Sequence, residues 1–508
     1  MKESNRGTTL RVIIIALFAL SEIAFVYYAF HQFSEKAVYV EAILRIVSVI
    51  IILWIVNNSA HLSSDMMWII LISLFPIFGT VTYLLIGGNL FISNTYRSIL
   101  AEEKKAAGYY VQNEEVLTEL TEKDSENIGQ FRYISLGCNY PIYRNSSFTY
   151  YELGDKAFPE MLEALNEAKE YIFMEYFIIE EGFMWNSVLE VLERKAKEGL
   201  DVRVMYDDVG SMLTLNVTYA SKLQEKGIKC MSFNRVNPII NIIINHRDHR
   251  KIMVIDGKVA FSGGINLADE YINLKEKYGH WKDNCFRIEG EAVWSYTVMF
   301  LTNWNALRHE DEDYLKFKYD FGEETEMDGY IAPYADTPLD NELVGQNVYL
   351  NIINQANNYV YIATPYLVID TDVRNALVLA AKRGVDVRII TPGIPDKKIV
   401  YQVTRSFYEH LINGGVKIYE YTPGFIHSKV FVSDDKIAST GTINLDFRSL
   451  YLHFENNTYL YNSEAVLDIK KDMTDTMTLS REIHSGEIRF GLIKGMLIAT
   501  VRIFSGLL

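Results

Sequence analysis

One short pattern of polar residues occurs twice in the chain, and it constrains the fold more than any other feature. The first copy runs from His249 to Asn266 and the second from His427 to Asn444, 178 residues later. Both copies read H-x-K-x4-D-x6-G-x-x-N, which places the same polar or glycine residues over 18 positions. A period of this length is far beyond that of solenoid arrays. The pattern therefore predicts two copies of one domain.

The segments that precede each copy also repeat, in the order strand, helix, strand. Near-identical stretches, KEGLDVRV and KRGVDVRI, join the helix to the next strand in the two halves. The corresponding segments are residues 172–179, 188–199 and 200–208 in the first half, and residues 359–369, 372–384 and 385–393 in the second. Because alternating strands and amphipathic helices are typical of such domains, we expect an α/β fold in both halves.

Three apolar segments precede the repeat: residues 10–30, 37–56 and 66–88. Each is long enough to cross the hydrocarbon layer, which takes about 20 helical residues. We therefore expect a membrane anchor over residues 1–92 with two to three transmembrane helices. The alternative for the first segment is a cleaved signal peptide, but the segment lacks a small-x-small cleavage site. Glu41 and Arg45 are one helical turn apart and can form an ion pair within the second segment.

The charges around these segments leave the orientation in the membrane open. Basic residues precede the first segment and follow the third, whereas the connecting loops hold a single lysine, Lys36. The positive-inside rule therefore draws both ends towards the cytoplasm. An odd number of spans cannot satisfy this, unless one segment is re-entrant or interfacial.

A further apolar segment, residues 488–508, ends the sequence and carries Arg489, Lys494 and Arg502. We expect an interfacial helix here, with the basic residues among anionic headgroups. A buried core helix is the alternative.

The charge and cysteine content exclude several classes of protein. The formal net charge is −16, whereas general nucleic-acid binders carry a basic excess. The 3 cysteines form no CxxC motif, which argues against a disulfide framework or a structural zinc site. His246 and His249 resemble a metal-binding pair, but no third ligand stands at a usable spacing. We therefore expect no metal, no other cofactor and no nucleic-acid partner.

The residue types of the repeated pattern suit a phosphodiester. Residues i and i+2 of a strand share a face, so His249 and Lys251 point the same way, as do His427 and Lys429. Two such faces meeting about a pseudo-two-fold axis give one cavity with two imidazoles and two ammonium groups. The lysines can neutralise a pentavalent transition state without a metal. One imidazole can attack phosphorus while the other protonates the leaving alkoxide.

Further residues complete the candidate site. The asparagine that ends each copy returns an amide to the same face, and a glycine on that strand allows a ligand to approach the backbone. Each histidine also needs a carboxylate to hold its tautomer, and one candidate stands in each half. The aspartates after the apolar strands are explained better by a turn than by chemistry. A surface salt bridge explains the arginine after the second copy nearly as well as phosphate binding does. The candidates are catalytic His249, Lys251, Asp256, His427, Lys429 and Asp434; phosphate-binding Asn266, Asn444, Gly263, Gly441 and Arg448; and His-orienting Asp283 and Glu455.

These motifs resemble those of the phospholipase D superfamily, and the resemblance extends over nearly the whole chain to bacterial cardiolipin synthases. Similar stretches include FMEYFIIEEG, RVMYDDVGS, GHWKDN, ATPYLVID and NLDFRSLYLHFE. Lys282 and His453 depart from the family pattern, where arginine and asparagine are usual, and neither is expected to touch the catalytic set. The resemblance implies two duplicated α/β/α sandwich domains with pseudo-two-fold symmetry, which we expect over residues 109–315 and 325–480.

By this resemblance, His249 would be the nucleophile and His427 the general acid of a cardiolipin synthase. The implied reaction transfers a phosphatidyl group between two phosphatidylglycerol molecules through a phosphohistidine and releases glycerol. A hydrolase that releases phosphatidic acid, or a transferase that uses phosphatidylethanolamine, is the alternative. A nuclease and an inactive lipid-binding scaffold fit less well, because the chain is acidic and both motifs are intact. We expect a multi-pass protein of the cell membrane whose partners are phosphatidylglycerol and other anionic phospholipids.

Overall fold

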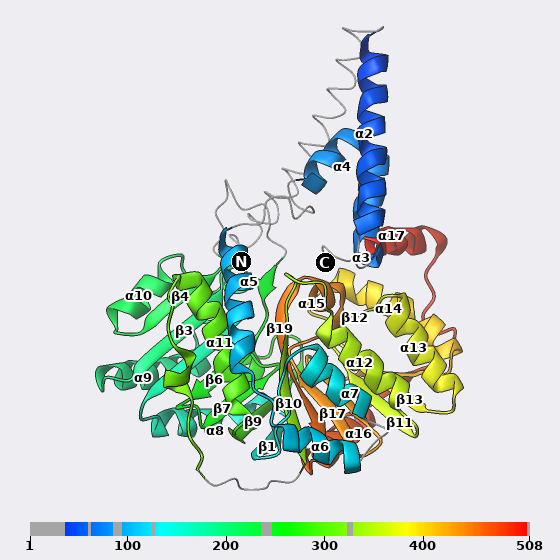
Figure 1. The fold of residues 1–508 in the computed structure, drawn as a ribbon. Coiled ribbons are helices and arrows are strands. Elements are labelled where there is room, and N and C mark those ends of the chain that lie inside the picture. Colours follow the sequence, from blue (N-terminus) through cyan, green and yellow to red (C-terminus); the bar gives the residue numbers. More distant parts are fainter. Residues whose placement is uncertain are drawn as a thin grey trace. The chain divides into compact units, whose positions relative to one another are not determined.

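The computed structural model describes residues 36–58, 62–84, 94–123, 128–234, 246–322 and 329–504 (Figure 1). The chain divides into two compact units. The first comprises residues 1–93 and 237–244, and the second comprises residues 94–236 and 245–508. The first predicted transmembrane segment, residues 10–30, lies outside the described residues.

The described part of the first unit consists of the helices α2 (Lys36–Asn58), α3 (Leu62–Leu74) and α4 (Pro76–Thr82). Within the residues that the structure describes, one stretch, Glu41–Asn58 in α2, is long and apolar enough to span a membrane. Arg45 Nη2 donates to Glu41 Oε1 at 2.8 Å, which confirms the predicted ion pair. The predicted span over residues 66–88 is not one continuous helix. Helix α3 ends at Leu74 and α4 begins at Pro76, which has no backbone N–H to continue the helical hydrogen bonds. An anchor of several spanning helices therefore stays a prediction.

The second unit contains two large sheets. The first is built from β1 (Ser146–Tyr151), β2 (Tyr171–Tyr176), β3 (Asp201–Asp207), β4 (Lys229–Phe233), β6 (Lys251–Ile255), β7 (Val259–Gly263) and β9 (Cys285–Gly290). The second is built from β10 (Tyr330–Asp336), β11 (Tyr359–Ala363), β13 (Asp386–Pro392), β14 (Lys417–Tyr421), β16 (Val430–Ser433), β17 (Ile437–Gly441), β19 (His453–Tyr461) and β20 (Ser480–Ile483).

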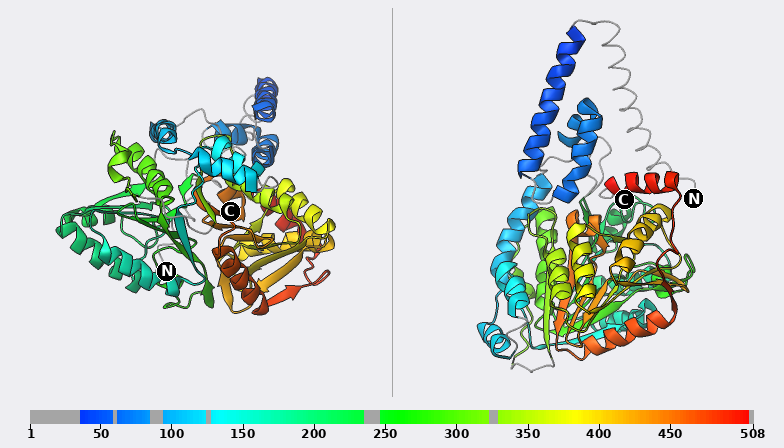
Figure 2. Two further views of the ribbon diagram at one scale, coloured as in Figure 1. Left: turned by 60° about the horizontal axis from the view of Figure 1, so that its bottom comes forward. Right: turned by 90° about the vertical axis from the view of Figure 1, so that its right-hand side faces the viewer.

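The two sheets share one strand order. It is β1-β9-β7-β6-β2-β3-β4 in the first and β10-β19-β17-β16-β11-β13-β14 in the second, where β20 is added at the far edge. The left view of Figure 2 shows the two sheets as separate halves of this unit. Because the orders correspond strand for strand, the structure confirms the duplication that the motif spacing predicts.

Helices cover both faces of each sheet. In the first half they include α8 (Gly154–Glu167), α9 (Phe183–Lys197), α10 (Tyr219–Glu225) and α11 (Val293–Arg308), and in the second α12 (Val344–Gln355), α13 (Thr371–Lys382), α14 (Lys398–Asn413) and α16 (Ala465–Thr478). Alternate residues of β2 show the layering: Ile172 and Met174 pack in the core with α8 and α9, whereas the ring of Phe173 stacks 4.7 Å from that of Phe300 on α11. Both faces of the strand are thus buried, which explains its continuous apolar sequence. The predicted α/β/α sandwich is confirmed.

The segment before the first sheet packs on the second half. Helices α6 (Glu114–Lys123) and α7 (Ile128–Arg132) contribute Leu120 and Phe131 to the core of that half, and the ring of Phe131 lies 5.0 Å from that of Tyr461. The sequence predicts that this segment belongs to the first domain, whereas its side chains pack on the second half, and the bounds of the two domains stay a prediction. The first sheet itself begins at Ser146.

Asp256 and Asp434, grouped in the sequence with the catalytic set, lie at turns. Each follows the motif strand, at the opposite end of β6 or β16 from the lysine. Asp256 and Gly257 have φ values of 53° and 65°, the left-handed values of a type I′ turn, and Lys258 N donates to the Ile255 carbonyl at 3.0 Å across this turn. The Asp256 carboxylate accepts three backbone N–H groups at 2.8–2.9 Å and that of Asp434 three at 2.7–2.9 Å, from Lys169, Glu170, Tyr171 and from Asn357, Asn358, Tyr359 respectively. Both aspartates therefore hold the start of the neighbouring strand, and the catalytic assignment is corrected to a structural one.

Candidate active site

Two short strand pairings join the halves where the motif strands begin. Strand β5 (Arg247–Asp248) pairs in parallel with the start of β19, and β15 (Gly424–Ile426) pairs in parallel with β8 (His280–Lys282). The N–H of His249 donates to the Phe454 carbonyl at 2.9 Å, and that of His427 donates to the Lys282 carbonyl at 2.7 Å. Each motif is thus hydrogen-bonded to the other half immediately before its lysine, which places both histidines at one interface.

Each histidine is held by a carboxylate from the opposite half. His249 Nδ1 lies 2.9 and 3.0 Å from the two carboxylate oxygens of Glu455, and His427 Nδ1 lies 2.6 Å from Asp283 Oδ2. Both carboxylates are fully buried. A carboxylate that accepts at Nδ1 fixes the proton there and leaves the lone pair on Nε2, where a nucleophile or base needs it. The sequence identifies both acids but not that the pairs cross between the halves.

Aromatic side chains that the sequence does not single out surround both imidazoles. The ring centroid of Phe177 lies 5.0 Å from that of His249, and three rings lie 5.7 Å from that of His427, namely Tyr271, Trp281 and Phe425. Phe177 and Trp281 fall within two stretches that resemble the family, FMEYFIIEEG and GHWKDN. This resemblance is the sequence feature from which their place in the site could be predicted.

Lys251 and Lys429 lie beside the histidines, as their spacing predicts. Lys251 Nζ donates to the carbonyl of His249 at 2.5 Å, and Lys429 Nζ lies 2.9 Å from His427 Nδ1. Because desolvation disfavours the charged form, burial lowers the pKa of Lys251 to about 7 and that of Lys429 to about 8.

The electrostatics of the site favour a bound anion. Burial and the two ammonium groups lower the pKa of His249 well below its usual value, and burial and Lys429 lower that of His427 to about 4. Both imidazoles are therefore neutral near pH 7. A phosphodiester bound here would restore the ammonium form of the lysines and bring a reacting phosphorus to the Nε2 atoms.

The side chains of the motif asparagines form hydrogen bonds with other groups of the protein. Asn266 Oδ1 accepts from Ile178 N at 3.0 Å and its Nδ2 donates to Tyr271 Oη at 2.7 Å, while Asn444 Nδ2 donates to Ser449 Oγ at 3.0 Å. A phosphate ligand would have to displace these bonds, so phosphate binding by the asparagines stays a prediction.

Gly263 and Gly441 lie against the neighbouring strand. A Cβ at these positions would come within 2.5 Å of the Asn284 carbonyl oxygen and 2.4 Å of Asn457 Oδ1 respectively. The close approach of the chain at β9 and β19 therefore requires glycine at both positions, and phosphate binding by these glycines stays a prediction.

His453 belongs to the site, which corrects the expectation that departures from the family pattern lie outside it. Its ring centroid is 5.5 Å from that of His249, and its Nδ1 is 3.6 Å from Glu455 Oε1. Arg448 Nε donates to His453 Nε2 at 3.1 Å, so Arg448 also borders the site, and its contact with phosphate stays a prediction. The side chain of Lys282, the other departure, instead donates to Asp472 at 2.6 Å.

Within the described part of the chain, one group of potential metal ligands is found, formed by His249, His453 and Glu455 with ligand atoms within 4.8 Å of one another. The hydrogen bonds oppose metal binding here. A guanidinium can only donate, so the Nε2 lone pair of His453 is taken by Arg448 and the proton of this imidazole lies on Nδ1. The neighbouring ammonium groups of the two lysines oppose a cation further.

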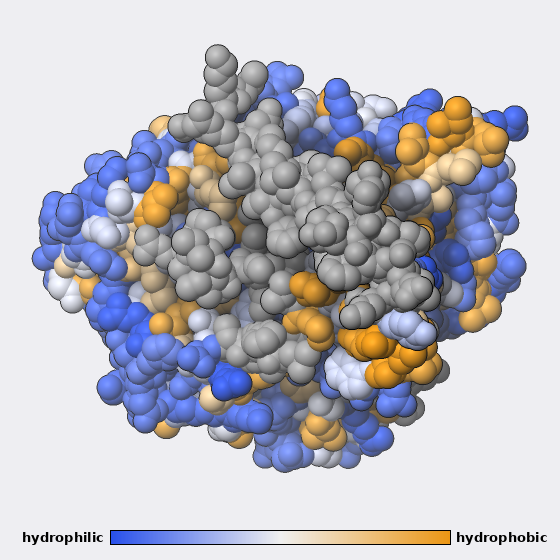
Figure 3. Space-filling view, turned by 90° about the horizontal axis from the view of Figure 1, so that it is seen from above, coloured by the Kyte–Doolittle hydropathy of each residue, from blue (hydrophilic) through white to orange (hydrophobic). Residues whose placement is uncertain are grey.

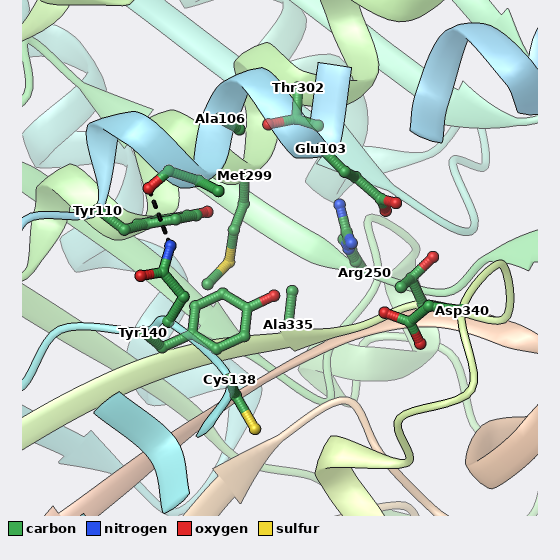
Figure 4. Close-up of a pocket in the computed structure, with 13 residues that line it drawn as sticks. Glu103, Ala106, Tyr110, Cys138, Tyr140, Arg250, Met299, Thr302, Ala335 and Asp340 are labelled. Atoms are coloured by element: carbon green, nitrogen blue, oxygen red, sulfur yellow. Dashed lines mark hydrogen bonds between the residues drawn. The ribbon is translucent and has the colours of Figure 1, made fainter. Parts of the chain in front are cut away.

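A separate cavity of about 160 Å³ lies behind the site (Figure 4). Arg250 points into it because successive residues of an extended chain alternate between faces. Glu103 from α5 (Asn94–Ala106) and the rings of Tyr110 and Tyr140 also line it, and burial raises the pKa of Glu103 to about 7. Neither catalytic histidine lines this cavity. Its connection to the site is Arg250 Nε, which donates to the backbone carbonyl of Glu455 at 3.2 Å.

Known proteins resemble this chain in both sequence and fold. A family model described as "Cardiolipin synthase, PLD-like domain" matches residues 161–293 and 349–477, one match in each half. An uncharacterized protein of Streptococcus mutans is 44% identical, over 89% of this chain and 97% of its own. The cardiolipin synthases of Alkalihalophilus pseudofirmus and Halalkalibacterium halodurans are each 34% identical, over 92% of this chain and 92% of theirs. The solved structure of phosphatidylserine synthase from Haemophilus influenzae shares the fold, with a TM-score of 0.55 and 16% identity over 74% of this chain and 98% of that one.

The crossed pairs predict different defects for Glu455→Gln and Asp283→Asn. Both variants should lower kcat on a natural phosphodiester by about 10²- to 10⁴-fold, since each removes an acceptor that fixes a tautomer. With a p-nitrophenyl phosphodiester, whose leaving group departs without a proton, D283N should recover most of its rate while E455Q should not. Stopped-flow release of p-nitrophenol measures the difference.

The exposed His410→Asn variant serves as the control for expression and folding, and it should match the parent protein with both substrates. Equal recovery of E455Q and D283N on the activated substrate would contradict the assignment of one acid to each histidine.

The depressed lysine pKa values predict an alkaline limit to activity. Lys251 and Lys429 are ammonium ions below about pH 7 and 8 respectively and lose the charge as pH rises through these values. The value of kcat/KM, which reports the free enzyme, should therefore fall through this range. On the acid side it should fall only well below the usual pKa of an imidazole, where the nucleophile His249 becomes protonated, because burial lowers the pKa of His249. A profile that stays flat up to about pH 10, where an ordinary lysine titrates, would refute this.

Proposed function

The chain belongs to the cardiolipin synthase family with phospholipase D-like domains, and from this premise we propose that it is a phosphatidyltransferase that makes cardiolipin. The substrates are two molecules of phosphatidylglycerol, and the second product is glycerol. The observation that carries the proposal is the pair of crossed imidazole–carboxylate contacts, which brings two Nε2 atoms and two ammonium groups to one buried site.

In the first step, His249 Nε2 attacks the phosphorus of phosphatidylglycerol. The P–N bond forms as the bond from phosphorus to the glycerol oxygen breaks, and His427 donates a proton to that oxygen. A bound phosphodiester carries a negative charge beside His427, which raises its pKa from the low value of the free site and allows it to act as an acid. Glu455 accepts a hydrogen bond from the Nδ1–H of His249 and stabilises the positive charge of the phosphoimidazole.

In the second step, a glycerol hydroxyl of another phosphatidylglycerol attacks the phosphohistidine. His427, now neutral, takes the hydroxyl proton, the P–O bond forms and the P–N bond breaks, which frees His249. One phosphodiester is exchanged for another, so the reaction needs no nucleotide. Lys251 and Lys429 stabilise the added charge of both pentavalent transition states.

We also infer that the enzyme works at the cell membrane as a multi-pass protein. Support comes from the apolar helix α2 and from α17 (Leu492–Ile503). Ile498 of α17 is buried against the second half, whereas Leu492 and Ile493 are 82% and 78% exposed. The exposure of these apolar side chains disfavours a core helix and supports an interfacial one. Apolar side chains also gather in patches on the face of the molecule shown in Figure 3. Lipid alcohol is concentrated at such a surface, which favours transfer over hydrolysis.

The test is to reconstitute the full chain into phosphatidylglycerol vesicles with a metal chelator and to resolve the products. Cardiolipin and glycerol should appear in equal amounts, and a His249→Ala variant should form neither. Phosphatidic acid without cardiolipin would show a hydrolase instead. The same assay with phosphatidylethanolamine added as donor, which releases ethanolamine, measures how far the donor range extends.

A further inference from the structure

The duplicated site departs from its own symmetry at one position next to the histidines. Phe425 pairs with Trp281 between β15 and β8, and Arg247 pairs with His453 between β5 and β19. Trp281 and His453 therefore occupy equivalent places, one residue before the carbonyl that accepts from the motif histidine. The ring at this place is an indole beside His427 and an imidazole beside His249.

The proton of His453 can be placed from its partners. Arg448 Nε donates to His453 Nε2 at 3.1 Å, and a guanidinium has no acceptor, so Nε2 must carry the lone pair. The ring is neutral, because burial lowers its pKa to about 3, and its single proton therefore lies on Nδ1. This Nδ1–H is buried and has no hydrogen-bond partner within 3.5 Å in the described part of the chain.

The nearest acceptor to this proton is the carboxylate that orients the nucleophile. His453 Nδ1 lies 3.6 Å from Glu455 Oε1, about 0.6 Å beyond an ordinary hydrogen bond. The same oxygen is 3.0 Å from His249 Nδ1. A buried carboxylate offers about four acceptor positions, so it can take both donors at once. Arg448, His453, Glu455 and His249 thus lie in one line of potential donors and acceptors that ends at the nucleophile, hydrogen-bonded at both ends and with the 3.6 Å separation between His453 and Glu455 in the middle.

The equivalent residue does not form such a line. The Nε1 atom of Trp281 is buried and has no hydrogen-bond partner among the described residues, so the indole does not donate to Asp283. Asp283 therefore holds His427 without a second side-chain donor of this kind. The duplication gives both histidines a carboxylate, but it gives only His249 a carboxylate with a neutral imidazole beside it.

We propose that His453 is a positioning residue for His249: its Nδ1–H holds Glu455 in the orientation in which this carboxylate accepts the Nδ1 proton of the nucleophile. This deepens the proposed function, on which it rests, by assigning a residue to the step that forms the phosphohistidine. A neutral donor suits the position, since it restrains the carboxylate without adding a positive charge that would compete with the phosphoimidazole. Without it, Glu455 can rotate, and fewer molecules present His249 with a free Nε2 lone pair.

The test compares His453→Ala with His453→Asn, which restores a neutral N–H donor. H453A should slow formation of the phosphoenzyme about tenfold, in line with the loss of a residue behind a catalytic group, and should leave KM nearly unchanged. H453N should recover most of that rate. Rapid-quench trapping of the phosphoenzyme and p-nitrophenol release from an activated phosphodiester measure this step directly, whatever the final acceptor is.

A double-mutant comparison separates positioning from general support of the fold. In an E455Q background, H453A should cause little further loss, because its effect passes through Glu455. Additive losses in the double variant, or an H453N variant as slow as H453A with an unchanged Tm, would overturn the proposal. H410A and H410N, at an exposed histidine, are the matched controls.

The readouts also distinguish this inference from the proposed function. If the parent protein forms a phosphoenzyme but yields phosphatidic acid in place of cardiolipin, the transferase proposal fails while the role of His453 is still measured. If the parent protein makes cardiolipin and H453A forms its phosphoenzyme at the parent rate, only the inference about His453 fails.

Discussion

Two buried hydrogen bonds, each between an imidazole of one half and a carboxylate of the other, are the interaction on which the site depends. Neither half holds its own histidine in a defined tautomer, because Glu455 and Asp283 each serve the opposite motif. The strand pairings β5–β19 and β8–β15 bring the partners within reach. A buried carboxylate without donors is costly, so the same contacts that align the chemistry also stabilise the interface between the halves. The duplication therefore yields one active site rather than two.

The balance of charge in this interface gives the site its chemical character. Burial opposes ionisation of Asp283, but His427 and Lys429 lower its pKa, so the carboxylate stays charged. Burial also disfavours the charged form of the two lysines, and it lowers their pKa values to about 7 for Lys251 and about 8 for Lys429. An anionic phosphodiester relieves this desolvated positive charge, which is why such a substrate gains more from the site than a neutral ester would.

The sequence predicts those features of the fold and the site that depend on residues close together in the chain. The 178-residue spacing of the motifs predicts the duplication, and the shared face of His249 and Lys251 follows from strand periodicity. The Asp-Gly turn at Asp256 was also readable, because that pair is typical of a type I′ hairpin. Likewise, Pro76 marks the break in the third apolar segment, which segment length alone conceals.

The rest depends on contacts between residues far apart in the chain. The exchange of Asp283 and Glu455 between halves is set by strand pairings between residues far apart in the chain, and the two imidazole–carboxylate pairs span 144 and 206 residues. No local pattern specifies such pairings. The packing of α6 and α7 on the second half, where Phe131 contacts Tyr461, likewise depends on residues far apart in the chain. The sequence predicts that His453, which differs from the family pattern, lies outside the catalytic set, whereas its distance from Glu455 places it inside the site.

The central claim is that one site contains two histidines with separate roles, and the most direct measurement is the position of the covalent phosphate. The full chain is mixed with phosphatidylglycerol vesicles, quenched in alkali within the first turnover and mapped by mass spectrometry of its peptides. The account predicts the phosphatidyl group on His249 and none on other histidines. A modified His427 in the parent protein, or a phosphoenzyme that persists in a His249→Asn variant, would contradict it.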